Sequence, residues 1–413
     1  MPIVPLSRKY KVWFFIAFSS LVIAGILGSL LRLAFVIDLP LWVNYKNVLH
    51  AHSHVAMMGW IFGGLYIFII HYFELTRKVY ITIFWLVQLS VAGMLASFPV
   101  QGYGLVSIIF TTLHLFLSYI FVYNIFKDLS TDEHNVLSRY ATLFLKTAGL
   151  FLVVSTMGTW ALGIIMNTSF KGSALYYASI QFFLHFQFNG WFIFAMLSIF
   201  LKLCSKHMIL DDIKGLGKAY WYLLASCILT YALSVTWSTP EDLIFWINSI
   251  GVILQAVALY YIIRSVHQIW PKIKKHISTW TKTLFTIAFY GLVVKITIQT
   301  LVAIPYLATI SYTIKNFVIG FIHLLMLGTL TSFLIGNFEQ CVAKKKYSFG
   351  IWLFLTGFAF TETILFLQGL MLWKGMGFLP YYYTIILLAS MLMPLGFILY
   401  MWQKRTELNS SSH

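Results

Sequence analysis

Residues 45–70 read YKNVLHAHSHVAMMGWIFGGLYIFII, an apolar stretch with three histidines close to its start. Similar apolar stretches recur along the chain, and about 20 such residues in a helix cross a hydrocarbon layer of ~30 Å. Inside lipid every backbone group must be paired, which leaves helices or a closed barrel. Because the stretches are long and continuous, unlike alternating barrel strands, they indicate helices. The sequence therefore predicts an all-α, polytopic membrane bundle.

The composition supports one transmembrane domain over residues 1–413. Hydrophobic residues make up 60% of the chain and charged residues 10%, which is too little charge to cover a soluble surface. The three cysteines lie far apart, so neither a disulfide framework nor a thiolate cluster is indicated. The basic N-terminus leads into an apolar stretch that is too long for a cleaved signal peptide, and we interpret it as the first span.

Twelve spans are predicted, of which the third and seventh are the shortest. Their approximate positions are 11–36, 45–70, 80–98, 103–126, 141–165, 176–201, 219–236, 242–263, 283–308, 316–336, 348–372 and 381–401.

The placement of basic residues predicts the orientation. With the N-terminus inside, 22 of the 28 Lys and Arg residues fall on the cytoplasmic side. Clusters such as Lys272, Lys274 and Lys275, and the run 344–346, are interpreted as inner-leaflet anchors, so the net charge of +16 does not indicate nucleic-acid binding. We expect a protein of the bacterial inner membrane with both termini cytoplasmic. The outer loops hold only Lys46, Lys171, Lys315 and Lys374.

Five histidines are predicted to form a layer near the outer surface. Spans 2, 4, 6 and 10 run from outside to inside, and the five residues lie in the first turns of spans 2, 6 and 10. A helix rises ~1.5 Å per residue, so these positions correspond to similar depths in the outer leaflet. A sixth, His114, lies nearer the midplane in span 4. The five are His50, His52, His54, His185 and His323.

Such a layer is suited to metal binding. Neutral imidazole is an axial ligand of haem iron and a common copper ligand. His50 and His54 share one helix face, so either is predicted to meet His323 across the bundle, while His52 points away. Glycines that follow in both spans allow a macrocycle or a neighbouring helix to approach closely. The alternative is that these polar residues only form hydrogen bonds between helices.

Three charged residues lie at depth: Arg32, Lys295 and Glu362. Lys295 and Glu362 are expected at similar depth, where they form either a structural ion pair or part of a proton path. Arg32, together with Lys374 in the last outer loop, is a candidate partner for haem propionates. Both are equally consistent with interfacial anchors.

These features resemble subunit I of the haem–copper oxidases, which include cytochrome oxidases and nitric oxide reductases. The resemblance covers the twelve-span layout and two motifs. Val48-Leu49-His50, followed by Phe62-Gly63-Gly64-Leu65-Tyr66, is similar to the family's span 2, and Gly320-Phe321-Ile322-His323 to its span 10. The resemblance implies that His50, or His54 as the second choice, binds a low-spin haem together with His323. It also implies that His185 takes the position of a copper ligand.

The chain departs from the family at the oxygen-reactive centre. Phe321 replaces the first histidine of the family's span 10 pair, and span 7 lacks the adjacent histidines. Copper would then keep one of three expected ligands unless His114 or His52 contributes.

Two hypotheses follow. The first is a haem-binding protein of respiratory electron transfer, or of oxygen or nitric oxide reduction, with cytochrome c or a quinol as electron donor and partner subunits. The second is an NnrS-type haem- and copper-containing stress protein, or a metal transporter, without oxidase activity.

Overall fold

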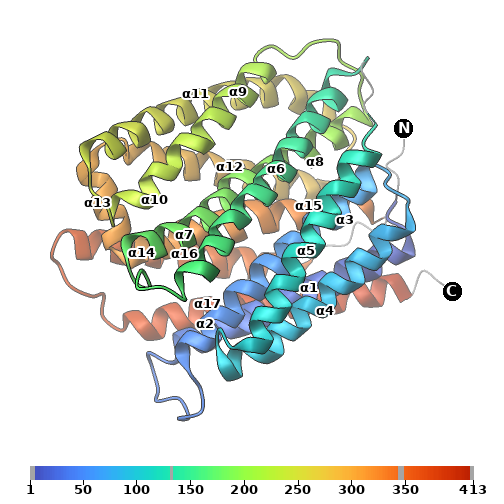
Figure 1. Cartoon of the computed structure of the whole chain (residues 1–413). Coiled ribbons are helices and arrows are strands. Elements are labelled where there is room, and N and C mark those ends of the chain that lie inside the picture. Colours follow the sequence, from blue (N-terminus) through green and yellow to red (C-terminus); the bar gives the residue numbers. More distant parts are fainter. Residues whose placement is uncertain (1–4, 131–133, 343–347, 410–413) are drawn as a thin grey trace.

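The computed structural model describes residues 5–130, 134–342 and 348–409, and this part of the chain consists of helices, turns and loops (Figure 1). The α-helices are α1 (Arg8–Leu33), α2 (Tyr45–His54), α3 (Phe62–Tyr72), α4 (Lys78–Gln101), α5 (Leu105–Asp128), α6 (Val136–Ile165), α7 (Ala174–His185), α8 (Ile193–Ser205), α9 (Leu216–Leu229), α10 (Leu233–Thr236), α11 (Asp242–Ile273), α12 (Thr279–Leu301), α13 (Pro305–Thr313), α14 (Lys315–His323), α15 (Ser332–Cys341), α16 (Phe349–Trp373) and α17 (Tyr382–Asn409). Three π-helical segments, η1 (Val55–Ile61), η2 (Phe186–Phe192) and η4 (Leu324–Thr331), and one 3-10 turn, η3 (Thr230–Ala232), connect some of them.

These helices form twelve segments that are long and apolar enough to cross a membrane, which confirms the predicted all-α polytopic bundle. The seventh is continuous from Leu216 to Thr236, through η3. The ninth differs most from the prediction, because α12 ends at Leu301 and Pro305 begins a separate short helix, α13. Proline is favoured in the first turn of a helix, where its missing N–H has no partner to lose.

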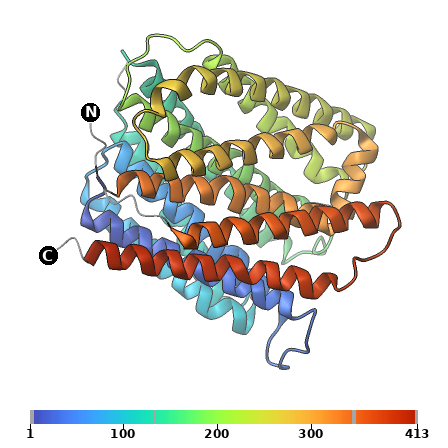
Figure 2. The same ribbon diagram turned by 180° about the vertical axis from the view of Figure 1, so that it is seen from behind.

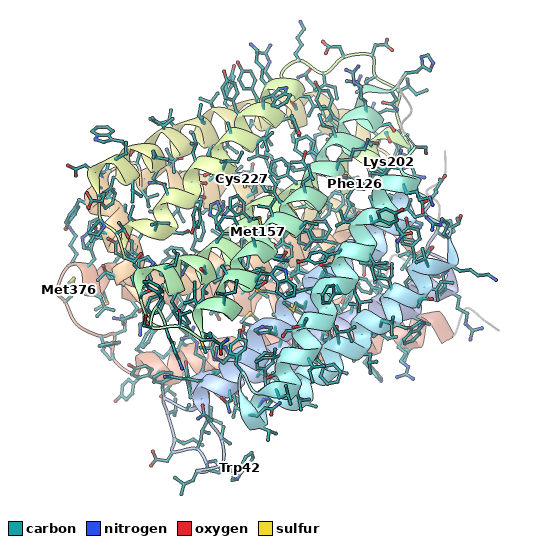
Figure 3. All side chains as sticks on the ribbon, in the orientation of Figure 1. Trp42, Phe126, Met157, Lys202, Cys227 and Met376 are labelled. Atoms are coloured by element: carbon teal, nitrogen blue, oxygen red, sulfur yellow. The ribbon has the colours of Figure 1, made fainter. Side chains whose placement is uncertain are left out.

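The chain ends and the two long loops lie at different places on the bundle. The N- and C-terminal labels are on the same side, and the α1–α2 and α16–α17 loops project from the bundle away from that side (Figure 1). Trp42 and Met376 mark these two loops, and Lys202 lies near the end with the termini (Figure 3). This arrangement agrees with an even number of crossings. The predicted anchor run 344–346 and His413 lie outside the described residues.

Three spans occupy the centre. The apolar windows of spans 2, 6 and 10 are 83, 72 and 67% buried inside the protein, whereas those of the other spans are at most 50% buried. The outer spans therefore turn much of their apolar surface to lipid, as α16 and α17 do side by side at the back of the molecule (Figure 2).

The central spans recur with a fixed period. Each is the second member of a consecutive group of four spans, and each contains a π-helical segment in its middle. π-Helical turns are rare and occur frequently at functional sites. The chain thus repeats one arrangement three times, and the repeated feature lies at its centre.

Candidate functional site

A histidine directly precedes each π-helical segment. His54 ends α2, His185 ends α7 and His323 ends α14. A glycine follows each of them five residues later, so the sequences read HVAMMGW at 54–60, HFQFNGW at 185–191 and HLLMLGT at 323–329. This His-x4-Gly repeat is visible in the sequence, but our sequence analysis did not use it. It identifies the three histidines as equivalent positions.

The repeated glycines serve helix packing. An added Cβ at Gly59 would lie 2.7 Å from the side chain of Ser20, and one at Gly190 would lie 2.5 Å from the ring of Phe151. In the third unit the added Cβ would lie 2.7 Å from the ring of Phe358. Of the two roles predicted for the span 2 and span 10 glycines, the structure supports the close approach of a neighbouring helix.

His54, the first of the three, lies among aromatic rings. Its ring centroid is 4.4 Å from that of Phe98, and its Nδ1 donates to the His50 carbonyl at 2.9 Å. Tyr103, in the loop before α5, is 3.5 Å from His54 Nε2 and 4.6 Å, centroid to centroid, from His50. Burial raises the pKa of Tyr103 to about 12, so its hydroxyl stays protonated. His50 and His54 therefore face the end of α4 and the α4–α5 loop.

His185, the second, has both ring nitrogens engaged. Nε2 donates to the carbonyl of Cys227 at 2.8 Å, and Nδ1 accepts from the amide nitrogen of Asn189 at 3.3 Å. The Oδ1 atom of Asn189 accepts from the ammonium of Lys295 at 2.6 Å, and Gln299 accepts from the same ammonium at 2.7 Å. His185 therefore has no free lone pair here, which does not support its predicted role as a copper ligand.

His323, the third, keeps an unpartnered nitrogen. Its Nδ1 is buried without a hydrogen bond, 3.8 Å from Oε1 of Glu362. Both carboxylate oxygens of Glu362 are also buried and without a hydrogen bond. Buried polar atoms in native proteins are nearly always satisfied, so an unsatisfied pair indicates a missing partner, such as water, an ion or a cofactor.

Arg32 and His52 complete the cluster around His323. Arg32, near the end of α1, interacts electrostatically with His323, Glu362 and His52. His52 also interacts with His323, and its Nδ1 donates to the carbonyl of Ala24 at 2.8 Å. We define His52, His323, Glu362 and Arg32 as the outer cluster.

The structure separates the three histidines of span 2. His52 interacts electrostatically with His323, whereas the rings of His50 and His54 lie against Phe98 and Tyr103. His50 and His54 share one face of the helix and His52 lies on another, as the sequence predicts. The pairing of His50 or His54 with His323 stays a prediction, and the structure favours His52 for it. The rotation of α2 has no signal in the sequence, because all three histidines lie in an apolar segment.

One further expectation differs from the structure, and one open alternative is favoured by it. Lys295 does not pair with Glu362, because it is held by Asn189 and Gln299. Lys374, in the loop between α16 and α17, lies 5.2 Å from the ring centroid of Trp373, which is typical of an interfacial anchor. Of the two candidate propionate partners, only Arg32 belongs to the outer cluster.

His114 occupies a separate position. It is 4% exposed, its Nε2 has no partner, and it lines a small cavity beside η1. His52, His114 and His185 do not converge: the described residues contain no group of three His, Cys, Asp or Glu side chains that could hold a metal ion. The three-histidine copper centre considered from the sequence is thus not formed.

No protein-family model matches the chain, and a search of curated proteins finds no match. The function is therefore inferred from the outer cluster and from the three equivalent histidines.

Proposed function

We propose that the chain is a haem-binding integral membrane protein, similar to subunit I of the haem–copper oxidases, that carries electrons in a bacterial inner membrane. The observation that supports this most directly is the outer cluster, in which His52 and His323, from two central spans, interact electrostatically beside a carboxyl group without a hydrogen bond. The excess of basic residues on the side of the termini favours cytoplasmic ends.

The residues of the outer cluster fit a haem with two imidazole ligands. His52 uses Nδ1 to donate to Ala24, which leaves the Nε2 lone pair for iron. His323 has Glu362 near its Nδ1, so its Nε2 is likewise the atom left for a metal. Arg32 offers a positive charge to a propionate. The haem, when bound, supplies one-electron redox chemistry.

Electron transfer fits these residues better than reduction of oxygen or nitric oxide. A haem held by both His52 and His323 would keep no open iron position for a gas. A second metal beside it would need His185, whose nitrogens are both engaged. The proposal includes a cytochrome c or a quinol as the electron donor and further subunits as partners.

The test is the haem content of the purified full-length protein. We expect a pyridine haemochrome signal in the wild type and its loss in His323→Ala. His267→Ala is the matched control, because His267 is exposed at the far end of α11. A wild-type protein without haem, or a His323→Ala spectrum identical to that of the wild type, contradicts the proposal.

The second candidate is a copper-handling membrane protein without oxidase activity, either a metal transporter or a haem- and copper-containing protein of the NnrS type. The observation that favours it is the cavity at His114, which has soft ligands in its wall. Copper without any haem in the purified protein would select the transporter.

A further inference from the structure

The cavity at His114 lies between the first two of the three repeat units. Its volume is about 20 Å³, and about 10–15 Å³ is enough for one water molecule or an ion of similar size. Its wall comes from η1, α3, α5, α6, α7 and η2, and includes His114, Met57, Met58, Ser118 and Gln187. The cavity is separate from the outer cluster, none of whose members lines it.

His114 brings an unpartnered nitrogen to this cavity wall. Its Nε2 is buried without a hydrogen bond, and the backbone of Met58 in η1 lies beside the ring. A buried imidazole nitrogen without a partner is a candidate to bind a water molecule or an ion. Metal-binding histidines commonly donate the other ring N–H to a backbone carbonyl, which fixes the tautomer and the ring orientation.

The polar wall presents lone pairs. The hydroxyl of Ser118 donates to the carbonyl of Leu115 at 2.7 Å, and the amide nitrogen of Gln187 is turned to Ser155 Oγ at 2.9 Å. Ser118 and Gln187 therefore donate their hydrogens to groups outside the cavity wall, and their oxygen atoms can still accept or bind a cation. A site with an imidazole nitrogen and oxygen lone pairs suits a cation and disfavours an anion.

The ligands select the kind of cation. Thioether sulfur is a soft ligand that selects Cu(I), and imidazole also binds copper. No acidic residue lines the cavity, so a monovalent ion costs less to bury there than a divalent one. We propose that His114, Met57 and Met58 form a Cu(I) site inside the membrane-spanning bundle.

The experiment is Cu(I) titration of the purified full-length protein in detergent, with ascorbate as reductant and a colorimetric Cu(I) chelator as competitor. We expect His114→Leu to bind one equivalent of Cu(I) per chain less than the wild type, because the variant lacks the imidazole ligand of the site. Met57→Leu with Met58→Leu keeps the side-chain volume and is expected to lose the same equivalent. His267→Ala removes one exposed imidazole and is expected to change nothing at this site.

The Cu X-ray absorption spectrum is the second measurement. Sulfur scattering is expected in the wild type and is expected to be absent from the double methionine variant, whose folding is checked by its thermal midpoint. Equal Cu(I) stoichiometry in the wild type and His114→Leu, which would leave only a water molecule in the cavity, overturns the proposal. Cu(I) binding at His114 does not require haem at the outer cluster. The Cu(I) proposal and the haem proposal can therefore be confirmed or rejected separately.

Discussion

The Nδ1 atom of His323 lies 3.8 Å from Oε1 of Glu362, and neither atom has a hydrogen bond. One residue comes from a central span and the other from α16, which packs beside it. A carboxylate next to the distal nitrogen of a metal-binding imidazole raises the ligand's basicity and fixes its orientation. Glu362 therefore has the position of a residue that tunes whatever His323 binds.

Glu362→Gln is expected to raise the midpoint potential of the proposed haem. The amide keeps the side-chain shape but cannot ionise, so at a pH where Glu362 is ionised the negative charge that stabilises the oxidised iron is lost. We expect a rise of about 30–60 mV, since a tenfold change for a one-electron couple corresponds to about 59 mV. The measurement is a redox titration of the reduced-minus-oxidised spectrum.

Thr363→Val is the control for this substitution. Thr363 follows Glu362 in α16, but its side chain is exposed. Its potential should equal that of the wild type. If Glu362→Gln retains haem with an unchanged potential, Glu362 has no tuning role, although the haem proposal itself would survive.

The three histidines of α2 should differ in their effect on haem. His52→Ala is expected to abolish haem binding, since His52 is the α2 histidine that interacts electrostatically with His323. His50→Ala should keep the cofactor, because the His50 ring faces Tyr103 and Phe98. The absorbance ratio of haem to protein after purification measures both.

His54→Ala serves as the sharper control, because it removes the histidine that is equivalent to His323 in the repeat. Loss of haem in this variant and retention in His52→Ala would reverse the assignment and restore the pairing that the sequence suggested.

The spans and their even number could be predicted from the sequence, whereas the layer of histidines stays a prediction. The spans and their number follow from apolar length and charge placement, which are local properties. The rotation of α2, by contrast, depends on contacts such as Gly28 against His52, where an added Cβ would lie 3.0 Å from Cε1 of the imidazole. Such a contact between residues of different spans has no local signal in a uniformly apolar helix.

The partner of Lys295 could likewise not be predicted from the local sequence. Span direction placed it at the depth of Glu362, but depth alone does not determine which neighbour a side chain meets. The ammonium is instead held by Gln299 on its own helix and by Asn189 across the interface. The His-x4-Gly repeat, however, was accessible, and comparing the three central spans would have shown it.

The glycines of the repeat should not tolerate a methyl group. Gly59→Ala and Gly190→Ala are expected to destabilise the protein by about 1–3 kcal/mol, the usual cost of overpacking a core. Gly163→Ala is the control, since nothing lies within 4 Å of the added Cβ, and it should be neutral or slightly stabilising. Thermal midpoints in one detergent compare the three, and a lower midpoint for Gly163→Ala than for Gly59→Ala would contradict the expected order.

Lys295→Met should destabilise the protein although it removes a buried charge. The variant leaves the Oδ1 atom of Asn189 and the Oε1 atom of Gln299 without their donor, at about 1–3 kcal/mol for each unsatisfied group. Adding Gln299→Leu removes one of these unsatisfied groups and should recover part of the loss. A double variant that is less stable than Lys295→Met would show that the network is not the cause.

The pair of Glu74 and Lys206, in the loops after α3 and α8, should give a small pH-dependent contribution to stability. The hydrogen bond from Lys206 holds the pKa of Glu74 below its usual value, and this outweighs the opposing effect of partial burial. A lowered pKa in the folded state stabilises the protein above the unfolded pKa, and the contribution is lost as the pH falls through the folded pKa. The Glu74 side chain is 69% exposed, so we expect only about 0.2–1 kcal/mol at neutral pH.

Lys206→Met tests this pair through thermal midpoints near neutral pH and at about pH 3, below the usual range for Glu. The variant should be less stable than the wild type at neutral pH, and the difference should shrink in acid, as Glu74 becomes protonated and loses its charge. Lys171→Met, in the exposed loop between α6 and α7, should show no such trend. A difference for Lys206→Met that stays constant across this pH range would mean that the lysine acts through packing rather than through the charge of Glu74.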